Sequence, residues 1–172
     1  MNKNKKILIT GASGFIGTNL LYSLLKQNLD IAVIDRHDNL MFDNVKKYIG
    51  DICDYSFLEK AIIDFQPNKV FHLAAYKNRS SAVEDMSKAL KVNLIGTLNI
   101  YQALLNVPAL ESIVTLGTTD EYGEINPPFN ESLTEMPSSN YGFSKFCVTK
   151  LSEFFNRNFK LPVVIIRPTI AY

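Results

Sequence analysis

Cysteines, clustered charge of one sign and long apolar runs are all scarce in this 172-residue sequence. The two cysteines, Cys53 and Cys147, are widely separated and form no C-x-x-C spacing, which argues against a disulfide framework or a zinc site. The formal net charge of +1 argues against nucleic acid as a partner, because that partner needs a clustered basic surface. No apolar run is long enough to cross a bilayer, so we expect no membrane partner. A reducing, cytoplasmic location is the resulting expectation.

The apolar residues that are present fall into short runs that alternate with longer helical patterns. Apolar residues make up 47% and charged residues 20% of the chain, as is usual for one globular domain of this length. Such alternation predicts an α/β fold with a doubly wound, Rossmann-like parallel sheet and right-handed crossovers. We predict six strands, at 6–10, 31–35, 47–50, 69–73, 112–116 and 162–167, and helices at 15–27, 56–65, 83–105 and 141–158.

A glycine-rich turn follows the first predicted strand. Gly11, Gly14 and Gly17 lie three positions apart, between that strand and the first helix, in a spacing that differs from G-x-G-x-x-G. Glycines allow a tight turn and let a pyrophosphate approach the helix N-terminus, where free amide groups attract anions. Gly17, one turn into the helix, allows close packing of helix on sheet. The turn therefore predicts a dinucleotide site.

Asp35 ends the second predicted strand, 18 positions after Gly17. In this register a carboxylate can accept hydrogen bonds from an adenosine ribose. Arg36 follows it and could favour a 2′-phosphate, but the carboxylate at the strand end would repel that phosphate. The pair predicts NAD rather than NADP.

Tyr141 and Lys145 lie four positions apart on one helical face, after a long loop at 123–139 that is rich in Pro, Asn and Ser. A tyrosine has a pKa of about 10, too high for a base at neutral pH. A neighbouring ammonium favours the phenolate, and a bound nicotinamide cation would add to that effect. The pair therefore predicts an acid/base centre with a lowered tyrosine pKa. His72, by contrast, ends a buried strand, where a histidine is more often a hydrogen-bonded structural group than a catalytic one.

The motifs TGASGFIG, GDICD, HLAAYK, VNLIGT, GTTDEYG, YGFSK and RPTIAY follow one another along the whole chain. In this order they resemble the extended short-chain dehydrogenase/reductase family, and within it the NAD-dependent nucleotide-sugar epimerases and dehydratases. The resemblance implies NAD as cofactor, a nucleotide sugar as substrate, a homodimer, and hydride transfer at a sugar carbon.

The resemblance also implies roles for single residues. Thr118 matches the family's catalytic Ser/Thr, because it lies four residues before Tyr122 of the YG pair. Tyr141 would be the acid/base, and Lys145 would orient the ribose and lower the pKa of that tyrosine. The predicted cofactor-binding residues are Gly11, Ser13, Gly14, Phe15, Ile16, Gly17, Asp35, Arg36, Asp51, Ile52, Leu73, Ala74, Ala75, Lys77, Asn93, Tyr141, Lys145 and Pro168.

The segment between Thr118 and Tyr122 leaves the reaction open. Thr119-Asp120-Glu121 reads as the Thr-Asp-Glu triplet of the dehydratases, where two acids help eliminate water. It lies one residue closer to YG than in those enzymes, so only Asp120 falls on an acid position. An acidic pair just before YG also resembles reductases of 4-keto-6-deoxy sugars. Epimerase, dehydratase and reductase all remain open, as does a non-catalytic NAD-binding module.

In the family, the motif matched here by RPTIAY is followed by the rest of the sheet and by a domain that binds the nucleotide sugar. We therefore expect residues 1–172 to form the NAD-binding domain with the catalytic motif, without the substrate-binding domain. Such a chain should bind NAD and turn over nucleotide sugars negligibly. The helices predicted at 83–105 and 141–158 carry apolar residues on more than one face, which favours a homodimer.

Overall fold

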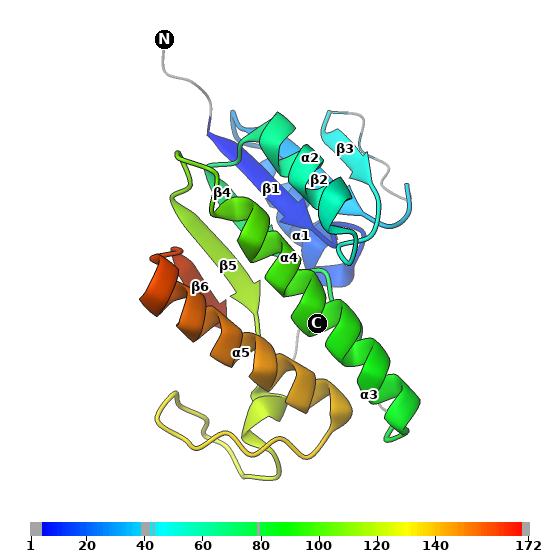
Figure 1. Cartoon of the computed structure of the whole chain (residues 1–172), viewed down its shortest axis with the longest axis vertical. Helices are drawn as coiled ribbons and strands as arrows, with labels where there is room; N and C mark the ends of the chain where they lie inside the picture. Colours follow the sequence, from blue (N-terminus) through cyan, green and yellow to red (C-terminus); the bar gives the residue numbers. More distant parts are fainter. Residues whose placement is uncertain (1–4, 39–41, 43, 79, 170–172) are drawn as a thin grey trace.

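A twisted, six-stranded parallel sheet with the order β3-β2-β1-β4-β5-β6 forms the centre of the molecule (Figure 1). The structure, a computed structural model, describes residues 5–38, 42, 44–78 and 80–169. The strands are β1 (Lys6–Thr10), β2 (Asp30–Asp35), β3 (Lys46–Ile49), β4 (Lys69–His72), β5 (Ser112–Leu116) and β6 (Val163–Ile166). The predicted fold class and all six predicted strands are confirmed, with ends that differ by one residue where they differ.

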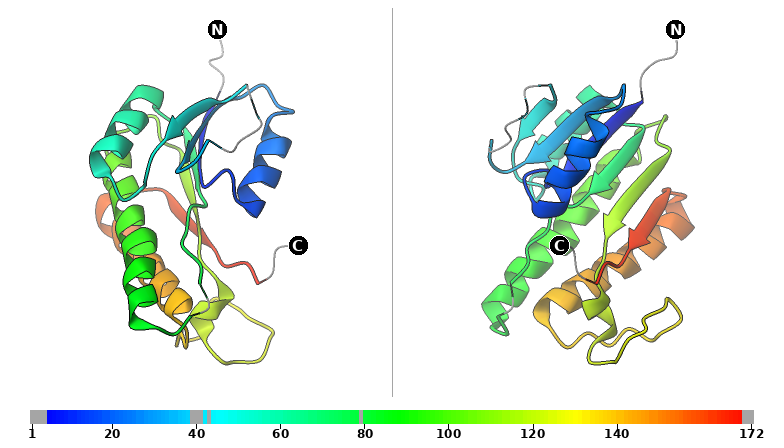
Figure 2. Two further views of the ribbon diagram at one scale, coloured as in Figure 1. Left: turned by 90° about the vertical axis from the view of Figure 1, so that its right-hand side faces the viewer. Right: turned by 180° about the vertical axis from the view of Figure 1, so that it is seen from behind.

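Helices cover the two faces of the sheet unequally (Figure 2). One face is covered by α1 (Phe15–Leu24), and the other by α2 (Tyr55–Phe65), α4 (Gly96–Leu104) and α5 (Asn140–Phe159). The helix predicted at 83–105 is not uniform, because the π turn η1 (Leu90–Ile95) separates α3 (Val83–Ala89) from α4. A short 3₁₀ turn, η2 (Thr119–Tyr122), follows β5.

The alternation of side chains along each strand builds two apolar cores. Leu8, Val70 and Ile113 point to the face of α2, α4 and α5, and Ile7 and Ile9 point to the face of α1. All of these side chains are 3% exposed or less. Burying each contributes about 1.5–3 kcal/mol relative to exposure, which explains why short β-branched runs suffice to specify the strands.

The strand order reverses direction between β1 and β4. The chain goes outward from β1 through β2 to β3, then returns to β4 and continues outward to β6. At such a switch point the loops after β1 and β4 turn to opposite faces and leave a crevice at the carboxyl edge of the sheet. The fold therefore predicts where a ligand should bind.

His72 is a structural residue, as expected for the end of a buried strand. It is 2% exposed, its Nδ1 lies 2.7 Å from Thr10 Oγ, and its Nε2 lies 2.9 Å from Thr97 Oγ. The Thr97 hydroxyl donates to the carbonyl of Asn93, so its oxygen accepts from Nε2–H, and the Thr10 hydroxyl donates to Nδ1. Burial, with the nearby charge of Lys145, lowers the pKa of His72 from 6.5 to about 3.

This lowered pKa makes the stability of the fold sensitive to acid. Between pH 3 and 6.5 the unfolded chain binds a proton at His72 that the folded chain does not, so stability falls as the pH falls through this window. We expect about 1.4 kcal/mol per pH unit from this group. Urea unfolding at several pH values should therefore show a shallower pH dependence in His72→Gln. His37→Gln, at the exposed histidine, should match the unmodified chain, and equal slopes for all three would contradict this assignment.

Candidate active site

The glycine turn forms the floor of the crevice at the switch point. Gly11 has a φ of 71°, and a Cβ atom there would lie 2.6 Å from the main-chain nitrogen of Ala74. Only glycine combines this left-handed conformation with so close an approach of the loop after β4. The helix α1 begins at Phe15 without a side-chain cap. Its first amide groups are thus suited to an anionic ligand.

Asp35 is held in place by two main-chain amides. Its Oδ2 accepts from the N–H of Ser13 at 2.9 Å, and its Oδ1 accepts from the N–H of Arg36 at 2.8 Å. The carboxylate faces a hollow of about 180 Å³. Ten of the predicted residues line it: Gly11, Ser13, Gly14, Asp35, Arg36, Asp51, Ile52, Leu73, Ala74 and Ala75.

A larger cavity, of about 760 Å³, adjoins this hollow and shares Gly14, Leu73 and Ala75 with it. All three predicted catalytic residues, Thr118, Tyr141 and Lys145, line the larger cavity. The predicted residues Phe15, Ile16, Lys77 and Pro168 line it as well. Residues from α1, β5 and α5 and from the segments after β1, β4 and β6 thus meet in one crevice, although they lie far apart in the sequence.

Two predicted cofactor-binding residues line neither space. Gly17 is buried beneath the turn, where a Cβ atom would lie 2.4 Å from the carbonyl oxygen of Gly11. Asn93 is 1% exposed, and its side chain bonds to the N–H and the carbonyl of Tyr76 and to Ser144 Oγ. Both residues support the walls of the crevice without lining it. Gly17 allows α1 to pack closely on the glycine turn, and Asn93 holds the loop after β4 against α5.

Thr118 and Lys145 are already oriented by the main chain. Thr118 is the N-cap of η2, its Oγ accepts from the N–H of Asp120 at 3.3 Å, and the described contacts include no acceptor for its hydroxyl proton. Lys145 is 4% exposed and its Nζ donates to the carbonyl of Leu116 at 2.8 Å. Both groups therefore present hydrogen-bond donors near Tyr141.

The pKa of Tyr141 differs from the sequence-based expectation. Burial, with smaller contributions from the carboxylates of Asp120 and Glu121, raises it to about 12. The Nζ atoms of Lys77 and Lys145 lie 5.3 Å and 6.0 Å from the centre of the tyrosine ring. Burial also lowers the pKa of Lys145 to about 8, against the opposing effect of Glu121. For the protein groups alone the expected lowering of the tyrosine pKa is therefore wrong, because burial and two carboxylates raise this pKa.

Several residues at this site were not predicted. Asn78 and Ser139 line the larger cavity, and Ser139 caps α5 by accepting from the N–H of Gly142 at 2.9 Å. Asp120, which the sequence placed on an acid position, lines this cavity too. Glu121 completes a capping box with Thr118, a role that the pattern T-x-x-E would have indicated.

The comparisons with known proteins agree with this geometry. The sequence model of the "NAD dependent epimerase/dehydratase family" matches residues 7–172. The chain belongs to this family. The family's description names NAD, which confirms the cofactor prediction, and the resemblance to epimerases and dehydratases of the extended short-chain type is confirmed with it.

Individual relatives include both kinds of enzyme. The dTDP-D-glucose 4,6-dehydratase of Dictyostelium discoideum is 31% identical over 98% of this chain and 44% of its own length. The UDP-glucose 4-epimerase of Mycoplasma genitalium is 30% identical over 94% of this chain and 51% of its own. The structure of the Thermus thermophilus UDP-glucose 4-epimerase in complex with NAD matches 94% of this chain and 54% of that one, with a TM-score of 0.85 and 29% identity. The chain thus spans about half the length of the relatives it matches.

A further hollow, of about 940 Å³, lies beside β6 and contains none of the predicted site residues. The candidate active site is therefore assigned to the smaller cavity of about 760 Å³, because Thr118, Tyr141 and Lys145 line it. Within the described ranges, no helix is both long and apolar enough to cross a membrane.

The fixed carboxylate of Asp35 yields a test of cofactor choice. We expect NADH to bind at least about tenfold more tightly than NADPH, a difference of about 1.4 kcal/mol, because the 2′-phosphate would meet this anion. Fluorescence titration of both cofactors measures the ratio. Asp35→Ala should narrow the gap, and Asp38→Ala, an exposed acid nearby, should not. Equal or tighter NADPH binding to the unmodified chain would overturn the role of Asp35.

Proposed function

We propose that this chain is the cofactor-binding and hydride-transfer part of an NAD-dependent enzyme that acts on nucleotide sugars, with Tyr141 as its acid/base. One observation carries the proposal: Thr118, Tyr141 and Lys145 line the same cavity as the turn that begins α1. A donor, an acid/base and a cation around the reactive end of a dinucleotide site are what oxidation of a sugar hydroxyl requires.

In this proposal each side chain has one task. NAD, when bound, supplies the acceptor and donor of the hydride. Tyr141 removes the proton of the sugar hydroxyl and returns it after reduction. Thr118 donates its hydroxyl proton to the same sugar oxygen, whose charge changes during the reaction. Lys145 orients the cofactor ribose and keeps a positive charge near the tyrosine.

The two acids after Thr119 bear on the reaction type. Asp120 is exposed and lines the cavity, whereas Glu121 is 0% exposed and does not line it. Elimination of water with the help of two acids therefore lacks one of them, and we favour epimerisation. Reduction of a 4-keto-6-deoxy nucleotide sugar is the alternative, because the acidic pair Asp120-Glu121 just before YG resembles such reductases. A non-catalytic NAD-binding module is disfavoured, because it would have no need of the three reactive side chains.

We further propose that residues 1–172 form an NAD-binding domain and that a part of the protein outside them binds the nucleotide of the substrate. The relatives, which have about twice this length, support this. Binding energy from the nucleotide would position the sugar, and such positioning can contribute about 7–11 kcal/mol to catalysis.

The test of this function compares two chains in the presence of NAD and a panel of UDP-, GDP- and dTDP-sugars, with products identified by mass spectrometry and chromatography. The 172-residue chain should bind NAD and give negligible product. A chain extended by the part of a homologous epimerase that these residues do not match should be active. Tyr141→Phe should abolish that activity, and Tyr22→Phe, on the outside of α1, should preserve it.

Full turnover by the short chain would contradict the proposed need for a second part. An extended chain that folds and binds NAD, but acts on no sugar of the panel, would contradict the proposed function.

The same helices that build the site suggest a dimer. Ile95 and Leu105 of the η1–α4 segment are 44% and 40% exposed, and Phe143 and Phe154 of α5 are 39% and 47% exposed. The spacing of 11 residues places Phe143 and Phe154 on one side of α5, whereas the spacing of 10 residues puts Ile95 and Leu105 about 80° apart on theirs. We propose that these two apolar stripes pair with the same stripes of a second copy.

Sedimentation should therefore show a dimer at tens of micromolar, because burial of both stripes would stabilise the association. Phe154→Glu should shift the equilibrium towards monomer. Tyr22→Glu, on the opposite side of the sheet, is the matched control and should remain dimeric. A monomer at all concentrations would rule out the dimer for this chain.

A further inference from the structure

We propose that Glu121 is a positioning residue of the active site. Its buried carboxylate would fix the main chain at Thr118 against the helix that carries Tyr141 and Lys145, and would thereby set the relative placement of the three reactive side chains. This inference rests on the proposed function, because it assigns Glu121 a task within that site.

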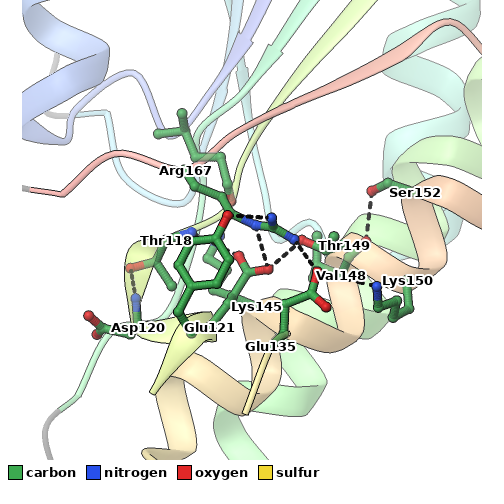
Figure 3. A network of polar contacts seen from close by, with 12 residues as sticks. Thr118, Asp120, Glu121, Glu135, Lys145, Val148, Thr149, Lys150, Ser152 and Arg167 are labelled. Carbon is green, nitrogen blue, oxygen red and sulfur yellow. Dashed lines mark hydrogen bonds and ion pairs between the residues drawn. The ribbon is translucent and has the colours of Figure 1, made fainter. Parts of the chain in front are cut away.

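The contacts of Glu121 connect the two sides of the crevice (Figure 3). Its Oε1 accepts from the N–H of Thr118 at 2.9 Å, and its Oε2 accepts from Thr149 Oγ at 2.7 Å. Thr149 lies one helical turn beyond Lys145 on α5. A single carboxylate therefore holds the end of β5 and the catalytic turn of α5 together.

Arg167 supplies the balancing charge. Its Nε donates to Glu121 Oε2 at 3.0 Å, and its two terminal nitrogens donate to Tyr122 Oη at 2.8 Å and to Glu135 at 2.7 Å. The Arg167 side chain is 13% exposed, and the Glu121 side chain is 0% exposed. Because an unpaired charge at such depth is unfavourable, the pair can persist only with this complete set of partners.

The main chain leaves room for this carboxylate and for little else. A Cβ atom at Gly117 would lie 2.5 Å from Glu121 Oε1 and 3.0 Å from Arg167 Cγ. Gly117 immediately precedes Thr118, so the carboxylate lies directly against the segment that it fixes. The packing at Gly117 thus depends on the position of the Glu121 carboxylate.

Asp120 and Glu121 can be distinguished by experiment although they are neighbours. Both carboxylates oppose ionisation of Tyr141, and the ammonium groups of Lys77 and Lys145 lie 5.3 Å and 6.0 Å from the centre of its ring. Removing either negative charge should therefore move the Tyr141 titration to lower pH. Only Glu121, however, accepts from the amide of Thr118.

The test uses nuclear magnetic resonance of the 172-residue chain, with ¹⁵N labelling for amide exchange and ¹³C-labelled tyrosine for titration. In Glu121→Met, which has no acceptor, the Thr118 amide should exchange at least about tenfold faster, as expected for the loss of one hydrogen bond. Glu121→Gln keeps an acceptor and should retain part of the protection, while both variants shift the Tyr141 titration to lower pH. NADH affinity should stay within about twofold, because neither variant touches the glycine turn or Asp35.

Two further variants complete the design. Asp120→Asn should shift the Tyr141 titration but leave the exchange of the Thr118 amide unchanged. Glu153→Gln, at an exposed acid of α5, should change neither quantity. If Glu121→Met does not fold, the test rests on Glu121→Gln. Faster hydrogen exchange of the Thr118 amide in that variant supports the proposal, and an unchanged exchange rate overturns it.

Turnover gives the second measurement, in the extended chain described above. Glu121→Gln should lower kcat by about 10- to 100-fold with KM within about twofold, because a misplaced donor affects the reaction more than binding. Unchanged kcat together with unchanged Thr118 exchange would overturn the proposal. If the unmodified extended chain has no activity but Thr118 exchange responds as expected, the proposed function fails and the structural part of this inference stands.

Discussion

The reversal of strand order between β1 and β4 is the constraint on which the rest of this molecule depends. Because all strands are parallel, their carboxyl ends lie along one edge, and the reversal opens that edge at a single place. Three segments that lie far apart in the sequence meet there: the glycine turn after β1, the Ala74 loop after β4 and Thr118 after β5. The apolar cores on both faces of the sheet hold this arrangement, so the stability of the fold and the geometry of the crevice have the same origin.

The electrostatics of the crevice follow from burial more than from neighbouring charges. Desolvation and two carboxylates raise the pKa of Tyr141 to about 12, and desolvation lowers the pKa of Lys145 to about 8. The protein groups alone thus favour the protonated form of Tyr141 over the phenolate. A positive charge brought next to the ring would reverse that preference. In the proposed function, the positive charge of a bound nicotinamide ring would act in this direction and lower the pKa of Tyr141.

Much of this architecture could be predicted from the sequence, because the determining signals are local. Strand periodicity, the glycine turn, Asp35 at a strand end and the Tyr141–Lys145 spacing each depend on a few adjacent residues. What could not be predicted depends on contacts between distant segments. Asn93 resembles a cofactor contact until the π turn η1 places its side chain between Tyr76 and Ser144. Arg167 reads as the end of a strand until the fold brings it to Glu121. The raised pKa of Tyr141 could not be predicted either, because its main cause is burial and the degree of burial is a property of the folded chain.

The contact between Gly117 and the Glu121 carboxylate has a consequence for how this sequence can evolve. A larger residue at 117 would collide with the carboxylate, so it becomes acceptable only after position 121 has changed. Loss of Glu121 in turn leaves Arg167 with Glu135 as its only carboxylate partner among the described contacts. Breaking such a buried pair typically costs about 3–5 kcal/mol, a large part of the stability of a domain. A change at 117 should therefore be found only in descendants that have already lost Glu121, and loss of Glu121 should be accompanied by a change at 167.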